Sequence, residues 1–199
     1  DRCACAIVSG TLRAEILETY PPDPPPDVAV SLLVGLPKAD KMDFILEKAT
    51  ELGASRVVPF RSSRTIPRPD PADARRRLAR WERVALAAAK QCGSGRVPEV
   101  SGIVPYPEAL RLAAEHEGKV VFYEGEGAFS LKRVLSGMGR VRTVALIVGP
   151  EGGFSTDEVR EAQAAGCRCA GLGSRILRVD TAALAVLAMV MYHFEKESA

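Results

Sequence analysis

A glycine-rich loop is the first segment whose residue types could do chemistry. It runs from Val148 to Ser155 as Val-Gly-Pro-Glu-Gly-Gly-Phe-Ser and follows the uncharged stretch Thr143–Val148. Its glycines let a backbone approach a ligand without obstruction by side chains, and Pro150 stiffens the turn. The spacing is neither G-x-G-x-x-G nor G-x-x-x-x-G-K-S/T, which argues against a generic dinucleotide site and a P-loop. A tight strand-to-helix turn without a ligand is the alternative.

A second loop, Leu172–Thr181, has the sequence Leu-Gly-Ser-Arg-Ile-Leu-Arg-Val-Asp-Thr, in which two arginines flank Ile176 and Leu177. Asp180 and Thr181 are suited to cap the helix that follows. An ordinary loop with solvated arginines is the alternative. Together the two loops predict one small-molecule pocket with backbone donors and apolar walls, which suits an adenine and ribose ligand.

The elements that must position these loops alternate between strands and helices. The predicted strands are Val28–Leu36, Arg56–Phe60, Val100–Val104, Lys119–Tyr123, Thr143–Val148 and Arg168–Leu172. The predicted helices are Asp40–Leu52, Asp70–Gln91, Pro107–Glu117, Phe129–Leu135, Thr156–Ala165 and Thr181–Glu195. This alternation predicts an α/β fold with a mostly parallel sheet and helices on both faces. Ligands of such sheets bind beyond the carboxyl ends of the strands, where both loops lie.

Local signals support several helix boundaries. Asp70-Pro71 is a typical helix start, and Ser155 with Glu158 forms a capping-box pattern. Trp81 falls on the apolar face of the long helix and is expected to pack against the sheet. The last helix is apolar nearly all round, which is typical of a helix buried in a core or an interface.

The N-terminal residues have a different pattern from the rest of the chain. Residues 1–20 predict a hairpin of Cys3–Val8 and Thr11–Leu17 around the turn Ser9-Gly10. A proline-rich segment, residues 21–27, predicts a stiff linker. We therefore expect three parts, with residues 1–20 as the remnant of a β domain, residues 21–27 as the linker and residues 28–199 as the α/β domain.

Composition narrows the function classes. Apolar residues make up 47% and charged residues 26%, which excludes a disordered chain. The net charge of +2 does not by itself indicate nucleic acid, so any basic patch depends on placement. No apolar stretch is long enough for a membrane span or a secretory signal, and five cysteines favour reduced thiols in the cytoplasm.

A metal centre is not expected. Cys3 with Cys5 and Cys167 with Cys169 are C-x-C pairs, whose side chains would simply face one side of a strand. No pattern of paired C-x-x-C ligands occurs. His116 and His193 are expected at the surface and late in the last helix, which argues against a histidine-based catalytic or zinc centre.

Three blocks of the chain carry a family resemblance. They are Lys38–Met42 with Lys48–Gly53, then Gly149–Phe154, then Leu172–Ala183. In this order, over about residues 28–195, the chain resembles the bacterial 16S ribosomal RNA uridine-N3 methyltransferases of the SPOUT superfamily. The glycine loop recurs across that superfamily, whereas the Lys48–Gly53 block and the arginine-flanked Ile-Leu pair narrow the match to this family.

The resemblance implies a fold, a cofactor and partners. The C-terminal part would be threaded into a trefoil knot that binds S-adenosylmethionine, and the chain would form a homodimer that acts on 16S ribosomal RNA. An N-terminal PUA-like β-barrel, of which residues 1–20 are a remnant, would help to bind RNA. The implied cofactor-binding residues lie in the two loops: Gly149, Pro150, Glu151, Gly152, Leu172, Gly173, Ile176, Leu177 and Thr181.

Two charged residues are candidates for the chemistry of methyl transfer to uridine N3. Arg178 stays protonated and cannot be the base, but it can stabilise negative charge that develops on the uracil oxygens. Glu151 is a candidate general base or an orienting group, and its alternative role is to stabilise the loop beside the helix start.

Basic residues in loops and at helix starts are the candidate RNA contacts, which we expect on the side of the carboxyl strand ends. They are Lys38, Lys41, Arg61, Arg64 and Arg96, with Arg68 and Arg75–Arg77 as further candidates. Other readings remain open at this point: a SPOUT methyltransferase for another RNA site, or a non-catalytic RNA-binding or ribosome-assembly protein of the same fold. A nucleotide-binding enzyme with phosphate chemistry would need a P-loop, which the sequence lacks.

Overall fold

The computed structural model describes residues 2–19, 26–125 and 128–195 of the chain. Its main sheet has eight strands: β3 (Ala29–Gly35), β4 (Arg56–Arg61), β5 (Glu99–Val100), β6 (Val104–Pro105), β7 (Gly118–Phe122), β8 (Phe129–Ser130), β9 (Thr143–Val148) and β10 (Arg168–Gly171). The strand order is β5-β4-β3-β9-β7-β10-β8, with β6 paired to β4. The pairs described are parallel, so the carboxyl ends of the strands share one edge of the sheet.

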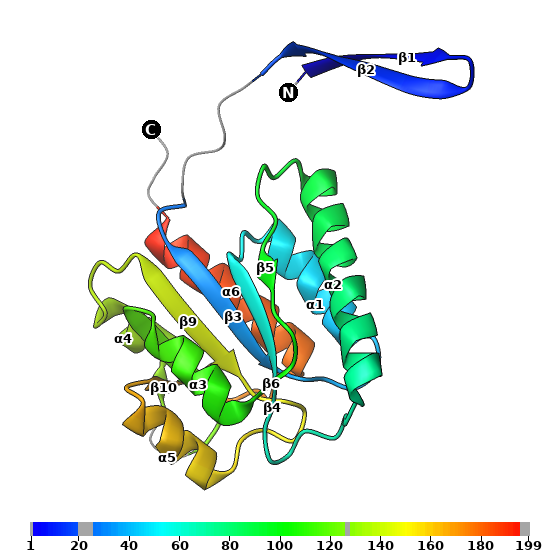
Figure 1. Cartoon of the computed structure of the whole chain (residues 1–199). Helices are drawn as coiled ribbons and strands as arrows, with labels where there is room; N and C mark the ends of the chain where they lie inside the picture. Colours follow the sequence, from blue (N-terminus) through cyan, green and yellow to red (C-terminus); the bar gives the residue numbers. More distant parts are fainter. Residues whose placement is uncertain (1, 20–25, 126–127, 196–199) are drawn as a thin grey trace.

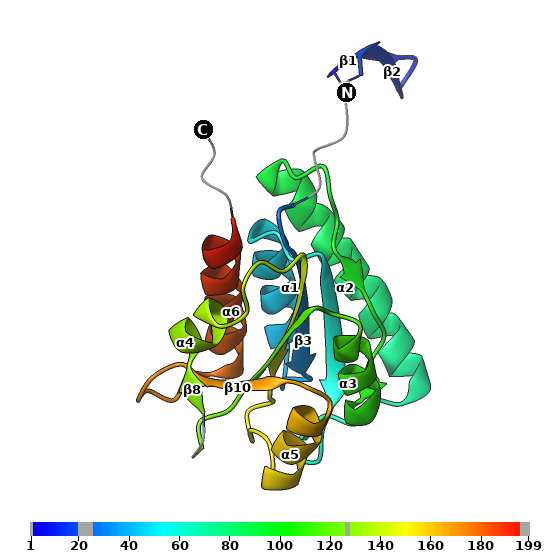
Figure 2. The same cartoon turned by 90° about the vertical axis from the view of Figure 1, so that its left-hand side faces the viewer.

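Helices cover both faces of the sheet. The helices are α1 (Lys41–Glu51), α2 (Pro71–Cys92), α3 (Tyr106–Ala114), α4 (Leu131–Ser136), α5 (Thr156–Ala164) and α6 (Val179–Phe194). Apolar residues of α1, α2, α4 and α6 belong to one core cluster, and those of α3 and α5 belong to the other. In Figure 1 α3 and α5 lie in front of the sheet and α6 behind it, and Figure 2 shows α6 and α4 on the same side of the sheet. The predicted α/β fold with a mostly parallel sheet is confirmed.

The central strands are apolar on both faces because both are covered. Leu32 pairs with Leu146 in one core cluster, while Leu33 pairs with Ile147 in the other. These four side chains are at most 1% exposed. Burial of an aliphatic side chain of this size contributes about 1.5–3 kcal/mol. The uncharged Thr143–Val148 stretch therefore lies in the sheet centre, as its composition predicts.

Most predicted helix boundaries are confirmed. The Asp70 side chain caps α2 by accepting a hydrogen bond from the Asp73 N–H at 2.8 Å, and the Ser155–Glu158 capping box is formed at α5. Asp40 occupies the N-cap position of α1 without a side-chain cap bond. Trp81 is buried in the first core cluster, as its place on the apolar face of α2 predicts.

Three predicted elements differ from the structure. The predicted strand Val100–Val104 is two short strands, β5 and β6, because Gly102 and its neighbours interrupt the pairing with β4. Residues 129–130 are extended rather than helical, since Ser130 is the N-cap of α4 and N-caps adopt extended angles. The last helix begins earlier than predicted, at the buried residue Val179. Asp180 and Thr181 therefore lie in its first turn, and Arg178 occupies the N-cap position.

The N-terminal hairpin is formed as predicted. Strands β1 (Arg2–Val8) and β2 (Thr11–Glu18) pair antiparallel, and Ser9 and Gly10 have φ of 52° and 76° in the turn. Among the described residues these strands pair with each other and not with the main sheet. Most of the predicted linker, residues 21–25 of 21–27, lies outside the described residues. The division of the chain into a β remnant, a linker and an α/β domain stays a prediction, as does the trefoil knot.

Candidate active site

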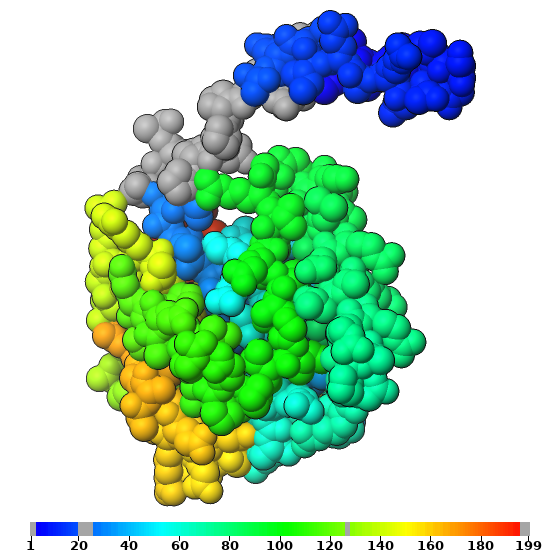
Figure 3. Space-filling view, in the orientation of Figure 1, coloured from blue at the N-terminus to red at the C-terminus, as the bar shows by residue number. Residues whose placement is uncertain are grey.

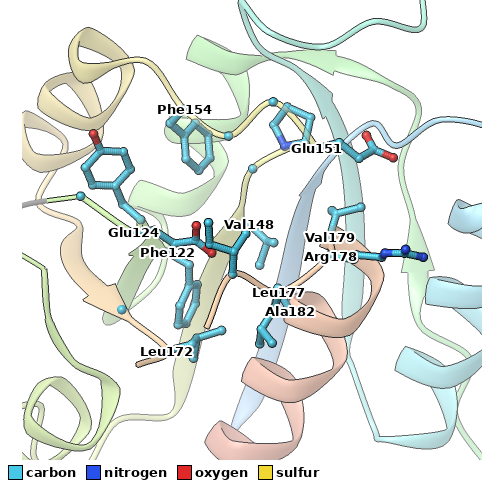
Figure 4. Close-up of a pocket in the computed structure, with 18 of the residues that line it drawn as sticks. Phe122, Glu124, Val148, Glu151, Phe154, Leu172, Leu177, Arg178, Val179 and Ala182 are labelled. Carbon is cyan, nitrogen blue, oxygen red and sulfur yellow. The ribbon is translucent and has the colours of Figure 1, made fainter. Parts of the chain in front are cut away.

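A cavity of about 600 Å³ opens at the carboxyl edge of the sheet. Its walls come from the loops that follow β7, β9 and β10, together with Arg64 after β4 and the start of α6. Figure 4 shows Phe122, Val148, Leu172 and Leu177 gathered on one side, with Glu151 and Arg178 on the other. A cavity of this size, with an apolar wall and a few charged groups, is typical of a site for a ligand of nucleoside size.

The glycine loop runs against the end of β3. A Cβ atom on Gly35 would lie 2.3 Å from the backbone nitrogen of Pro150 and 2.9 Å from the carbonyl carbon of Gly149. A Cβ on Gly149 would lie 3.1 Å from the Phe154 ring, and Gly153 has φ of 66°. The loop keeps this path because these positions have no side chain and because Gly153 tolerates a left-handed conformation.

Arg64 fixes the other end of this loop. Its guanidinium donates to the carbonyl oxygen of Gly152 at 3.1 Å, and a Cβ on Gly152 would lie 3.2 Å from the backbone oxygen of Arg64. Figure 3 shows the residues after β4, in cyan, against the yellow segment around residue 155 at the lower end of the molecule. The β4 loop is therefore part of the wall of the site.

Glu158 explains why these two loops stay together. Its carboxylate is buried and accepts hydrogen bonds from the Ser63 N–H at 2.6 Å and the Ser155 N–H at 2.8 Å. Its carbonyl oxygen accepts from the Tyr106 hydroxyl at 2.8 Å. A buried carboxylate needs such donors, so Glu158 links the helix cap of α5 to the loop that carries Arg64.

Glu151 lies at the rim of the cavity and is held by lysines. Its Oε1 accepts from the Lys38 N–H at 3.1 Å and from Lys41 Nζ at 3.2 Å. Desolvation raises the pKa of Glu151, but hydrogen bonds from its own N–H, the Lys38 N–H and Lys41 together outweigh it, so the net pKa is lowered. Because Oε1 already accepts from two donors, the geometry favours the orienting role of Glu151 over the role of general base.

The second loop of the sequence analysis, Leu172–Thr181 (the arginine loop), supplies another wall of the cavity. Ile176, Leu177 and Arg178 line the cavity, and Arg178 is exposed at the N-cap position of α6. Ile176 is 84% exposed, so it reaches solvent at the mouth of the cavity. A cationic side chain placed at the rim of a cavity can contact a second substrate that docks over the mouth.

Most of the predicted cofactor-binding residues meet at this cavity. Those that line it are Gly149, Pro150, Glu151, Gly152, Leu172, Ile176 and Leu177. Gly173 and Thr181 are exposed and lie outside the lining. Gly173 has φ of 99°, so its glycine is required by the turn rather than by contact with the cavity.

Sequence reasoning missed a third loop. The cavity is lined by Phe122, which is the last residue of β7, and by Tyr123, Glu124 and Gly125, which follow it. Their position after a predicted strand of a parallel sheet was the available signal, because every such strand ends at the edge where ligands bind. Glu124 adds an exposed carboxylate that can accept hydrogen bonds from hydroxyl groups.

The candidate RNA contacts do not all lie together. Four of them lie at the carboxyl edge, as predicted: Lys38 and Lys41 follow β3, Arg61 is the last residue of β4, and Arg64 follows β4. Arg96 instead precedes β5 and lines a different cavity with Pro26, Ser55 and Met191 at the amino edge. The expectation that Arg96 shares the side of the strand ends is wrong, because its loop enters the sheet rather than leaving it.

Further candidate arginines are spread along α2 and the segment before it. Arg68 and Arg75 are exposed, while Arg76 and Arg77 form ion pairs with Asp73 at 3.3 Å and 2.8 Å. Pairing with a carboxylate lowers the net charge that these two arginines offer to a phosphate backbone. The run of three arginines therefore presents less net positive charge than its sequence suggests.

The cysteines and histidines lie away from the chemistry. Cys167 and Cys169 are buried in the second core cluster, and burial raises the pKa of the Cys167 thiol to about 11. His116 is half-buried rather than at the surface, since its Nε2 lies 2.8 Å from Ser31 Oγ. Within the described residues no group of three or more His, Cys, Asp or Glu could hold a metal ion.

Comparisons with known proteins agree with this geometry. A profile described as RNA methyltransferase domain matches residues 24–191. The chain belongs to the RNA methyltransferase domain family. A relative from Bacillus subtilis, named ribosomal RNA small subunit methyltransferase E, is 35% identical over 98% of this chain and 74% of its own length. A relative of the same name from Mycobacterium tuberculosis is 32% identical over 91% of this chain and 69% of its own length.

A solved structure of an RNA methyltransferase is similar throughout the fold. The structure of ribosomal RNA small subunit methyltransferase E from Neisseria gonorrhoeae, bound to S-adenosyl methionine, has a TM-score of 0.83 and 33% identity. The match covers 94% of this chain and 76% of that one. The resemblance to bacterial ribosomal RNA methyltransferases that the three sequence blocks indicate is therefore confirmed.

Among the described residues, none of the helices has the length and apolar character that a membrane span requires.

Proposed function

We propose that this chain is an S-adenosylmethionine-dependent methyltransferase that modifies N3 of a uridine in the 16S RNA of the small ribosomal subunit. The observation that carries the proposal is the 600 Å³ cavity built by the glycine loop and the arginine loop. The S-adenosyl methionine bound to the similar methyltransferase of Neisseria gonorrhoeae supports the cofactor. The names of the Bacillus and Mycobacterium relatives support the small-subunit RNA substrate.

The residues of the cavity fit this cofactor. Phe122, Leu172 and Leu177 offer apolar contacts for an adenine ring, and Glu124 can accept hydrogen bonds from ribose hydroxyls. The glycine loop brings its backbone close to the cavity at positions where a Cβ would meet Phe154 or Arg64. When bound, the cofactor supplies an electrophilic methyl group, and the protein supplies orientation and electrostatics.

The charged groups at the rim divide the remaining work. Arg178 stabilises negative charge on the uracil oxygens when N3 gives its proton to solvent water, since a guanidinium remains protonated. Glu151 orients Lys41 and the glycine loop through an ion pair in which Lys41 Nζ lies 3.2 Å from Glu151 Oε1. Arg61, Arg64 and Lys38 lie on the same edge and are suited to contact phosphates of the RNA.

The proposal includes a homodimer. The exposed side chains of Met189 and Tyr192 on α6 are 50% and 85% exposed, and Ile176 lies in the loop before this helix. Exposed apolar side chains of this kind, on a helix whose other face is buried in the core, are typical of an interface between subunits. The proposed small-subunit RNA substrate supports a location in the cytoplasm, because bacterial ribosomes are assembled there.

Two structural details of the implied family belong to the proposal as well. The C-terminal part forms a trefoil knot, which is supported by the insertion of β10 between β7 and β8, two strands that precede it in the chain.

Residues 1–20 belong to a β-barrel domain that assists RNA binding. The exposure of the described hairpin side chains supports this, because a two-stranded hairpin is marginally stable alone.

Titration with S-adenosylmethionine tests the cofactor. The chain is expected to bind it saturably in calorimetry, and Gly152→Val is expected to weaken binding at least about tenfold, because overpacking against the Arg64 backbone shifts the loop. Gly102→Val is the matched control, since a Cβ there meets nothing within 4 Å. A folded chain that does not bind the cofactor would contradict the proposal and favour a non-catalytic RNA-binding protein.

The dimer is tested by sedimentation. The chain is expected to sediment as a dimer at micromolar concentration, and Tyr192→Glu combined with Met189→Glu is expected to shift it to monomer. Placing charges in an apolar interface costs several kcal/mol, and each 1.4 kcal/mol raises the dissociation constant of a dimer about tenfold. Leu86→Glu, on an exposed apolar side chain of α2, is the control and should remain dimeric. A wild-type monomer would refute this part of the proposal.

A further inference from the structure

Lys41 lies between the glycine loop and the start of α6. It is the first residue of α1, directly after the loop that follows β3. Its Nζ lies 3.2 Å from Oε1 of Glu151 in the glycine loop and 3.6 Å from Oδ1 of Asp180 at the start of α6. One ammonium group therefore joins two segments of the cavity wall that are far apart in the sequence.

Asp180 needs this cation. Its Oδ1 is shielded from solvent and accepts no hydrogen bond within the described part of the chain. A carboxylate oxygen without water or a donor is unfavourable unless a positive charge is close. Among the described residues, Lys41 is the cation that lies within ion-pair distance of it.

Lys38 and Lys41 act differently although both were candidate RNA contacts. Lys38 reaches Glu151 through its backbone N–H, so its side chain is not used in this contact. Lys41 uses its side chain for both carboxylates and is 31% exposed. A lysine engaged with two carboxylates has little net charge left for a phosphate.

We infer that Lys41 is a positioning residue for the cofactor site, which holds the glycine loop against the start of α6 through Glu151 and Asp180, and not an RNA contact. The inference rests on the proposed function. Loss of the Lys41 ammonium would leave Glu151 with its backbone donors but Asp180 without a partner. The two cavity walls would then be less ordered before the cofactor binds, which lowers affinity through the added ordering entropy.

The experiment measures cofactor and RNA binding of the full chain carrying Lys41→Met. The dissociation constant for S-adenosylmethionine, from calorimetry, is expected to rise roughly tenfold, and Lys41→Arg should restore most of the affinity because it keeps the charge. The slope of log affinity against log salt for a small-subunit RNA fragment should stay unchanged. An RNA contact predicts the reverse: unchanged cofactor affinity and a slope smaller in magnitude by about 0.7–0.9, which would overturn the inference.

Lys48→Met is the matched control. Lys48 lies on the same helix, is 34% exposed and also pairs with two carboxylates, those of Glu47 and Glu51. Its substitution removes the same kind of interaction away from the cavity and should leave cofactor affinity unchanged. If Lys48→Met weakens cofactor binding as much as Lys41→Met, the effect is a general loss of helix stability and the inference is wrong.

A second substitution separates positioning from simple destabilisation. Asp180→Asn in the Lys41→Met background removes the unpaired charge, so it should recover part of the lost cofactor affinity. No recovery would contradict a role for the Lys41–Asp180 pair. If the wild-type chain itself does not bind S-adenosylmethionine, the proposed function fails. If it binds and Lys41→Met binds equally well, only this inference fails.

Discussion

Arg178→Ala is expected to lower kcat for methylation of small-subunit RNA by about 10²–10³, while the dissociation constant for S-adenosylmethionine changes by less than about threefold. The size of the effect is that of removing one preorganised donor to a developing oxyanion. The side chain lies at the rim of the cavity, on the side where Glu151 also projects, so the cofactor cavity keeps its apolar wall without it. Transfer of labelled methyl groups to small subunits measures kcat.

Arg175→Ala is the control for this substitution. Arg175 is also exposed and belongs to the same loop, but it does not line the cavity. Its substitution should change kcat by less than about threefold, since Arg175 does not line the cavity. Equal losses for Arg175→Ala and Arg178→Ala would mean that the loop contributes general basic charge, and the specific role of Arg178 would be wrong.

Gly35→Ala is expected to weaken S-adenosylmethionine binding about 10- to 100-fold, although Gly35 itself is not part of the cavity. The added Cβ would lie 2.3 Å from the Pro150 nitrogen, so the glycine loop must move away from the end of β3. Overpacking of this kind costs about 1–3 kcal/mol, and each 1.4 kcal/mol taken from binding is a tenfold loss of affinity. Calorimetry gives the affinity, and urea denaturation gives the accompanying loss of stability.

Gly102→Ala serves as the comparison for Gly35→Ala. It adds the same methyl group where nothing lies within 4 Å, so cofactor affinity should not change. If Gly35→Ala bound the cofactor as tightly as wild type, the close packing of β3 on the glycine loop would have no bearing on the site. A variant that fails to fold is recognised by its circular dichroism, and Gly152→Val then carries the test of the loop.

Local patterns were sufficient to predict most elements, because their causes lie within a few residues. Asp70-Pro71 begins α2 and Ser155 with Glu158 caps α5, since caps act on the first turn of a helix. The alternation of strands and helices was enough for a parallel sheet. The errors fall where a tertiary partner decides the outcome, as for the broken pairing of β5 and β6 with β4.

The candidate site was predicted in part for the same reason. The glycine loop and the arginine loop each carry a distinctive run of residues, and both line the cavity. The loop after β7 carries no such run, and its role depends on β7 lying between β9 and β10 in the sheet. The order of strands follows from long-range pairing, which a local pattern does not encode.

The sequence by itself determined the α/β class, the two loops that line the cavity and the family to which the chain belongs. Only the tertiary structure decided that Lys41 faces Glu151 and Asp180, that Gly35 packs on Pro150 and that Arg96 lies at the opposite edge of the sheet. The physical reason is that helices and turns are stabilised by neighbours in the chain. Contacts among loops depend instead on which strands lie side by side.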